Sequence, residues 1–350
     1  EMCIRDRPPP PPATVRRTVS QEVARQLQAA GARFCFTVPA EPILPLLDDL
    51  AAAGIRVVTT RHEGGAAFMA DAVSRASDSV GVLMVVPAAG LTHAMSGVGE
   101  AFLDGIPMLI VSGGVRTDMT QGFQLHDVDQ QALMRTLTKA TYKIESYDEV
   151  VPTVYRAYRT AIEGEPGPVY IELPANLQLF TGEVDQVPPF DGAIDRPPLD
   201  QDAVAAAVDL LSRATKPGIF VGWGARHVAD DIRRIAEHLG APVATTLQGL
   251  AAFPADHPLH TGMGFGPSSV PAAQNAFRDC DAMLAVGTRF AEICTGSFGA
   301  VPPENLVHID INAAAIGRNH ATPVALHADS RDAVPAIAQL LLEKVPARDG

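Results

Sequence analysis

The chain of 350 residues is poor in cysteine, in aromatic residues and in positive charge. Its four cysteines form no Cys-x-x-Cys pair, which excludes a zinc ribbon and gives no sign of a disulfide framework. Lysine and arginine number 27 against 40 acidic residues, and the net charge of −13 argues against nucleic acid or a membrane surface as main partner. No apolar run approaches the ~20 residues of a membrane span. We therefore expect a soluble, cytoplasmic protein.

Apolar residues make up 47% of the chain, enough for a large buried core, so disorder is not the default. At ~100–200 residues per domain, the length leaves room for two domains or three small ones. Residues 1–12 are set apart from the fold, because they end in five consecutive prolines and begin with Glu rather than Met. We expect this segment to be a disordered, non-native arm.

From residue 18 onward, short apolar runs typical of buried parallel strands alternate with helical stretches. The strands are expected at 33–38, 56–60, 80–86, 108–112, 169–173, 218–221, 242–245, 282–286 and 306–309. The helices are expected at 20–30, 43–53, 64–76, 202–213, 229–239 and 333–342. Residues 181–199 are rich in proline and acidic residues, and predict an extended linker. The pattern predicts an α/β protein with two doubly wound parallel sheets, in domains 13–180 and 200–345.

Three residues of the first half lie where an expected strand gives way to a helix, the edge at which α/β sheets bind ligands. Glu63 can exchange a proton with a ring nitrogen, or it can merely offset the dipole of the helix that follows. Gly90 lets the backbone approach a cofactor, although a single glycine is a weak sign of a phosphate site. His93 can be catalytic, or it can cap a helix or pack in the core. The residues alone leave these alternatives open.

The second half has weaker signals. Gly222 and Gly224 flank Trp223 after an expected strand, as in a turn that approaches a nucleotide, but a histidine at 227 interrupts the Gly-x-Gly-x-x-Gly motif. Asp310 ends another expected strand and can accept hydrogen bonds from a ribose or cap a helix. No group of residues has the spacing of a metal site, so no metal ligand is predicted.

Several segments, taken in order, are similar to consecutive parts of one family. In the first half these are Pro39 with residues 43–48, residues 61–64 (Arg-His-Glu-Gly), 101–108 and 167–174. In the second half they are residues 246–250, 257–264, 286–290, 308–311 and 316–319. Together they resemble the thiamine-diphosphate enzymes of the acetolactate synthase and pyruvate oxidase group, from about residue 18 to about residue 342. The resemblance implies a pyrimidine-binding domain followed by a central, FAD-binding domain.

The resemblance also implies a set of cofactors and contacts. Glu63 would hydrogen-bond the pyrimidine N1′ of thiamine diphosphate and promote the imino tautomer of that ring. The third, diphosphate-binding domain of the family is missing, and with it the ligands of Mg²⁺, so we expect the chain to be a fragment that is inactive alone. FAD would bind the central domain. The implied cofactor-binding residues are Pro39, Gly90, His93, Gly222, Gly224, Thr246, Leu247, Gly262, Met263, Gly287, Arg289, Phe290 and Asp310.

The activity that the resemblance implies is that of an acetolactate synthase-like carboligase. Such an enzyme decarboxylates a 2-keto acid such as pyruvate and joins the product to a second 2-keto acid. The alternatives are a 2-keto acid decarboxylase, a 2-hydroxyacyl-CoA lyase or a pyruvate oxidase, and, from another class, a noncatalytic cofactor-binding or regulatory protein. The implied partners are a second copy of the chain in a homodimer or tetramer, and a regulatory subunit.

The chain departs from the synthases in its loops. Ala40 and Glu41 stand where the synthases usually carry two glycines, and Ala88-Ala89-Gly90 stands where they carry Gly-Pro-Gly. His93 replaces an asparagine, and residues 291–293 replace two aspartates and an arginine. Since glycine permits close approach and positive φ, the added side chains are expected to narrow the site or alter its substrate.

Overall fold

The computed structural model describes residues 15–179, 181–184 and 189–348, so the arm expected at 1–12 lies outside the described residues. The chain divides into two compact units, Glu1–Ile194 and Asp195–Gly350. This division falls inside the range 181–199, although the domain bounds given above stay predictions. Within the described residues, no helix is long and apolar enough to cross a membrane.

The first unit is built on a six-stranded sheet in the order β3-β2-β4-β5-β7-β6, with every neighbouring pair parallel. The strands are β2 Phe34–Thr37, β3 Arg56–Thr59, β4 Gly81–Val85, β5 Met108–Gly114, β6 Ala140–Lys143 and β7 Pro168–Pro174. Every residue of β4, β5 and β7 is buried, as expected for central strands covered on both faces.

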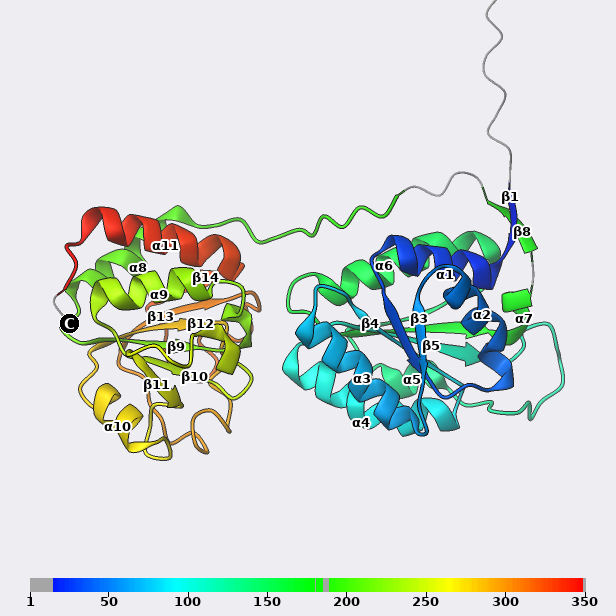
Figure 1. Cartoon of the computed structure of the whole chain (residues 1–350), viewed down its shortest axis with the longest axis horizontal. Helices are drawn as coiled ribbons and strands as arrows, with labels where there is room; N and C mark the ends of the chain where they lie inside the picture. Colours follow the sequence, from blue (N-terminus) through cyan, green and yellow to red (C-terminus); the bar gives the residue numbers. More distant parts are fainter. Residues whose placement is uncertain (1–14, 180, 185–188, 349–350) are drawn as a thin grey trace, which may run out of the picture. The chain divides into compact units, whose positions relative to one another are not determined.

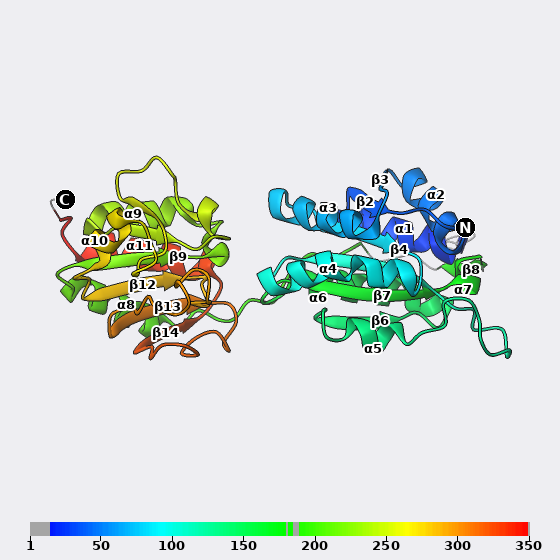
Figure 2. The same ribbon diagram turned by 90° about the horizontal axis from the view of Figure 1, so that it is seen from below.

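Helices cover both faces of this sheet (Figure 1). On one face lie α1 Val19–Ala29, α2 Leu44–Ala52 and α6 Val150–Ile162, and on the other lie α3 Glu63–Ala76, α4 Ala89–Asp104 and the short α5 Gln130–Met134. Figure 2 shows α3 and α4 side by side. Their close packing depends on small residues, because a Cβ added at Gly97 would lie 2.6 Å from the Cβ of Ala67.

The remaining elements of the first unit are short. The 3₁₀ turns are Glu41–Ile43 and Tyr147–Glu149, and α7 spans Ala175–Leu179. Strand β1, Val15–Thr18, pairs antiparallel with β8, Thr181–Val184. The prediction of an extended linker at 181–199 is therefore wrong for its first residues, which form a strand. The linker was predicted from prolines, and the first proline of this range is residue 188.

The second unit repeats the architecture, with a parallel sheet in the order β11-β10-β9-β12-β13-β14. Its strands are β9 Pro217–Val221, β10 Val243–Thr245, β11 His260–Met263, β12 Ala282–Val286, β13 Asn305–Asp310 and β14 Val324–His327. Its helices are α8 Gln201–Arg213, α9 Ala229–Leu239, α10 Pro271–Phe277 and α11 Ser330–Lys344, with 3₁₀ turns at Trp223–Ala225 and Leu250–Ala252. Helices α8, α9 and α11 lie together on one face (Figure 1).

Near the centre of each sheet lies a point at which the order of its strands reverses. In the first unit the chain moves outward from β2 to β3 and then returns to form β4 on the other side of β2. In the second unit the same reversal separates β9 from β12. Loops that leave neighbouring strands in opposite directions open a crevice at the carboxyl edge, where α/β proteins bind ligands. The fold is thus the predicted pair of doubly wound parallel sheets, with two places suited to a ligand.

Candidate functional site

Glu63 lies at the carboxyl edge of the first sheet as the first residue of α3. The preceding residue, His62, is the N-cap, and its Nδ1 accepts a hydrogen bond of 3.0 Å from the backbone N–H of Gly64. This cap fixes the start of the helix and therefore the position of the carboxylate. The side chain of Glu63 is 12% exposed, so it is shielded but can still be reached by a ligand.

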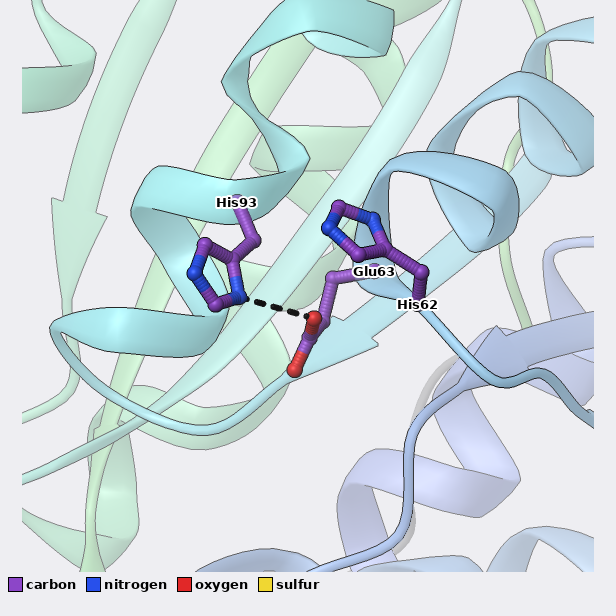
Figure 3. A group of neighbouring side chains, drawn as sticks. All are labelled: His62, Glu63 and His93. Carbon is purple, nitrogen blue, oxygen red and sulfur yellow. Dashed lines mark hydrogen bonds and ion pairs between the residues drawn. The ribbon is translucent and has the colours of Figure 1, made fainter.

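His93 comes from the neighbouring helix α4 and meets Glu63 directly (Figure 3). Its Nδ1 lies 3.1 Å from Oε2 of Glu63, and its side chain is 55% exposed. The rings of His62 and His93 are stacked, with centroids 5.2 Å apart. The structure therefore brings together two residues named from the sequence, Glu63 and His93, and adds His62, which the sequence argument treated only as a part of the motif.

Gly90 borders the same carboxylate. A Cβ at this position would lie 2.7 Å from Cγ2 of Val86 and 3.5 Å from Oε1 of Glu63. A larger residue would therefore need the loop to shift, and it would fill the space beside Oε1. Pro39, by contrast, is an exposed residue on the loop that follows β2, at the other side of the reversal point.

The backbone between β4 and α4 is held in an unusual conformation. Ala88 has φ 54° and ψ −92°, although only glycine adopts positive φ readily. The backbone N–H of Ala88 donates to Oε1 of Gln130 at 3.2 Å. The side-chain amide of Gln130 in turn donates through Nε2 to the carbonyl oxygen of Gly113 at 3.1 Å. The hydroxyl of Ser112 lies 3.3 Å from the Oε1 atom. Gln130, which the sequence analysis did not single out, thus ties this loop to β5.

Replacing Gln130 by Ala should lower the free energy of unfolding by about 2 kcal/mol, because it removes the hydrogen bonds that a buried amide makes with Ala88, Gly113 and Ser112. Gln130 is 3% exposed, so water cannot easily replace its amide. Denaturant titration of the first unit in the intact chain measures the effect. Replacing the exposed Gln121 by Ala is the matched control and should change the free energy of unfolding little. Equal losses in the two variants would contradict the role given to Gln130.

At the reversal point of the second sheet, the loops after β9 and β12 touch through their backbones. The N–H of Gly222 donates to the carbonyl oxygen of Val286 at 2.9 Å, and that of Gly224 donates to Gly287 at 3.3 Å. A Cβ at Gly222 would lie 2.1 Å from the carbonyl oxygen of Gly287. These three glycines, all named from the sequence, therefore form one backbone contact at the edge where a nucleotide is expected.

Around this contact, exposed apolar and cationic side chains lie on the loops. Leu247, on the loop after β10, is 49% exposed, and Arg289, on the loop after β12, is also exposed, whereas Met263, 40% exposed, ends the edge strand β11. Gly262, on β11, has φ 98°, a conformation that favours glycine. Apolar surface with a cation nearby suits a ligand that combines a flat ring with phosphate.

The other predicted residues of this unit are buried and partnered. The hydroxyl of Thr246 accepts from the N–H of Gly249 at 2.9 Å, and Oδ1 of Asp310 accepts from Asn312 at 2.8 Å. The Asp310 bond lies within a turn, since turns rather than a helix follow Asp310, so it is not the helix cap that the sequence left open. The ring of Phe290 is packed against Phe220, with centroids 5.6 Å apart. Cofactor contacts by these residues stay predictions.

His308 makes the stability of this unit depend on pH. It is 1% exposed, and its Nε2 donates to the carbonyl oxygen of Thr288 at 2.8 Å. Burial lowers the pKa of His308 and His320 adds to the effect, against the hydrogen bond to Thr288, so the folded ring takes up a proton at a lower pH than the unfolded ring, which does so below about pH 6.5. Since the unfolded state then binds more protons, stability falls as the pH drops below that value.

We expect His308→Gln to flatten this dependence in urea unfolding measured between about pH 7 and pH 5. Part of the slope should remain, because burial also lowers the pKa of His320. A slope in the variant as steep as in the unchanged chain would contradict the assignment.

Both units match known protein families. Residues 17–133 match the thiamine pyrophosphate enzyme N-terminal TPP binding domain, and residues 204–337 match the thiamine pyrophosphate enzyme central domain. The chain belongs to the thiamine pyrophosphate enzymes. Each match lies within one compact unit, and the first contains Glu63 and His93.

Individual relatives within this family are acetolactate synthases. The chain is 32% identical to the acetolactate synthase isozyme 2 large subunit of Escherichia coli, over 92% of this chain and 59% of that protein. It is 30% identical to the acetolactate synthase large subunit of Corynebacterium glutamicum, over 95% and 55%. It is 32% identical to the chloroplastic acetolactate synthase 1 of Nicotiana tabacum, over 94% and 50%. The chain thus spans little more than half the length of these relatives.

The residues of the first unit fit the thiamine half of the cofactor of these enzymes. A shielded carboxylate lies at the reversal point, and Gly90 keeps the space beside its Oε1 open. Mg²⁺ does not fit in the same way, because it prefers an all-oxygen set of ligands. In the part of the chain that the structure describes, the one group of three metal-ligating side chains is His62, Glu63 and His93, which includes two imidazoles.

Proposed function

We propose that the chain supplies the pyrimidine-binding and central domains of an acetolactate synthase-like carboligase. The observation that carries the proposal is the carboxylate of Glu63, placed at the reversal point of the sheet and matched to the TPP binding domain. Thiamine diphosphate, when bound, supplies the electron sink for decarboxylating a 2-keto acid such as pyruvate. The acetolactate synthases among its relatives support joining to a second 2-keto acid as the reaction.

Glu63 would act on the pyrimidine ring through one of its two oxygens. Oε2 faces Nδ1 of His93, whereas Oε1 lies on the side of Gly90. We assign Oε1 to the ring nitrogen N1′, because it is the oxygen beside which the glycine leaves room. A carboxylate in this position holds a proton at N1′ and so favours the imino tautomer. The shielded site keeps that hydrogen bond out of bulk water.

We assign the central domain to FAD, on the support of Arg289 and the exposed apolar side chains beside the glycine contact. Mg²⁺ would have its ligands in a diphosphate-binding domain, as the resemblance implies. We place the activity in the cytoplasm, as the composition suggests.

Two observations support the proposed partners of the chain, an exposed apolar surface and the names of the relatives. On α3, Phe68 and Met69 are 47% and 46% exposed, and on α4, Phe102 and Leu103 are 39% and 64% exposed. Apolar side chains gathered on neighbouring helices are typical of an interface between subunits. We assign this surface to a second copy of the chain in a homodimer or tetramer. Relatives named as large subunits support a regulatory small subunit as a further partner.

The assignment of FAD gives one prediction. Replacing Arg289 by Ala should reduce the flavin that remains bound after purification of the full-length gene product, because a cation at the crevice favours the phosphate groups. The flavin absorbance per chain measures the effect. Arg233→Ala, on the outer helix α9, is the control and should leave the flavin load unchanged. A full load in the Arg289 variant would contradict the assignment.

The proposed activity is tested by adding thiamine diphosphate, Mg²⁺ and pyruvate to the full-length gene product and measuring acetolactate, while the flavin spectrum is recorded. Acetolactate together with a flavin spectrum supports the proposal. A flavin spectrum without acetolactate would overturn the substrate assignment and direct the search to other 2-keto acids or acyl-CoA substrates. Neither product nor cofactor would overturn the proposal in favour of a noncatalytic protein.

A further inference from the structure

The two histidines beside Glu63 provide donor atoms that binding of a pyrimidine ring does not use. His62, Glu63 and His93 can each offer one ligand atom, and these atoms all lie within 4.8 Å of one another (Figure 3). Two imidazole nitrogens and one carboxylate oxygen are a donor set that suits zinc, cobalt or nickel rather than Mg²⁺. We propose that this triad binds a divalent transition-metal ion through Oε2 of Glu63, and that the ion and the cofactor's pyrimidine ring exclude each other, because the positive charge of the ion removes the basicity with which Oε1 would hold N1′.

The closest pair already has the spacing of two neighbouring ligands. Nδ1 of His93 and Oε2 of Glu63 are 3.1 Å apart. Two ligand atoms bound to one tetrahedral zinc ion lie roughly 3.3 Å apart, given bond lengths of about 2.0–2.1 Å. An ion between these atoms replaces the hydrogen bond, and the proton of Nδ1 moves through solvent to Nε2, so that the ring binds the ion as a neutral imidazole. Both side chains therefore need little movement to bind the ion.

His62 needs more adjustment. Its Nδ1 accepts the N–H of Gly64, so the ring can bind an ion through Nε2 and keep this cap, or through Nδ1 after turning away from it. The side chain has room to turn, because His62 is an exposed residue. Of the three residues, only Glu63 and His93 already share a hydrogen bond, so His62 is the weakest of the three ligands. The exposure of both histidines also gives an ion a path from solvent and leaves its fourth position to water, as in metal sites that exchange ligands.

The chain contains a matched pair that lacks the third ligand. His257 lies with its Nε2 3.1 Å from Oε1 of Glu237, and its Nδ1 accepts the N–H of Leu259 at 3.2 Å. This histidine thus has the same kind of carboxylate partner and the same kind of cap as the proposed site, but within the described residues it belongs to no group of three ligands. His257→Asn is therefore the control variant.

The test is a calorimetric titration of Zn²⁺ into the chain, repeated with Co²⁺ to record the visible absorption of the bound ion. We expect Glu63→Gln and His93→Asn each to weaken Zn²⁺ binding at least ~10-fold, since each removes a ligand. His62→Asn, which keeps a capping side chain, should have a smaller effect, and His257→Asn none. Circular dichroism checks that the variants are folded. Unchanged Zn²⁺ affinity in folded Glu63 and His93 variants would overturn the proposed metal site.

The exclusion of the pyrimidine ring rests on the proposed function and has its own probe. Thiamine without phosphate is used, because a diphosphate would itself bind Zn²⁺. Saturating thiamine should weaken the apparent affinity for Zn²⁺. Zinc binding that depends on Glu63 but ignores thiamine would overturn the exclusion, whereas the placement of the pyrimidine at Glu63 is tested by the activity of the Glu63→Gln variant. Loss of the metal site alone, by contrast, would leave the proposed function intact.

Discussion

Replacing Glu63 by Gln is expected to lower the turnover of the full-length gene product at least ~10²-fold, the usual scale for a group that transfers a proton. Glutamine has nearly the same shape as glutamate but cannot hold a proton at the pyrimidine nitrogen. Because Glu63 is shielded from water, no solvent molecule is well placed to take over this role. Acetolactate formation at saturating cofactor and pyruvate measures the effect.

The control for this variant is Glu100→Gln, which removes an exposed carboxylate from α4, the helix that also carries His93. It changes the net charge by the same amount and should leave turnover unchanged. If Glu63→Gln turned over as fast as the unchanged protein, this carboxylate would take no part in the reaction.

The second large effect is expected at the glycine contact of the second unit. Replacing Gly222 by Ala should lower the free energy of unfolding by about 3 kcal/mol, at the upper end of the cost of overpacking. The added Cβ would lie 2.1 Å from the carbonyl oxygen of Gly287, and a backbone atom cannot turn aside as a side chain can. Since β9 and β12 are central strands, their separation disturbs the whole sheet. Denaturant unfolding measures the loss.

Gly317→Ala is the control, because it introduces backbone strain without a steric overlap. Gly317 has φ 72° but no atom within 4 Å of an added Cβ, whereas Gly222 has φ −110°, which alanine readily adopts. Gly317→Ala should therefore lower the free energy of unfolding by only about 1 kcal/mol. A smaller loss at Gly222 than at Gly317 would contradict the close contact.

The central strands could be predicted from the sequence, because a strand buried on both faces is a continuous apolar run. β4 and β12 are examples, and every residue of each is buried. β6, β11 and β14 were not predicted. Each lies at or near an edge of its sheet and carries partly exposed residues, so its sequence lacks such a run.

The candidate site could be predicted only in part. Glu63 and His93 could each be named, because each follows a strand at the carboxyl edge of the sheet. Their contact could not be predicted, since it joins two helices and depends on how α3 packs against α4. The role of Gln130 depends on a chain segment 42 residues beyond the loop that it holds, and no local pattern reveals such a bond.

The proposed function requires that Glu63 activates thiamine diphosphate. The most direct measurement is the rate at which the C2 proton of the cofactor exchanges with deuterium, followed by NMR in the full-length gene product with Mg²⁺. We expect exchange on the unchanged protein to be much faster than on the free cofactor, and Glu63→Gln to lower its rate at least ~10²-fold. Equal exchange rates in the two proteins, both with bound cofactor, would contradict the central claim.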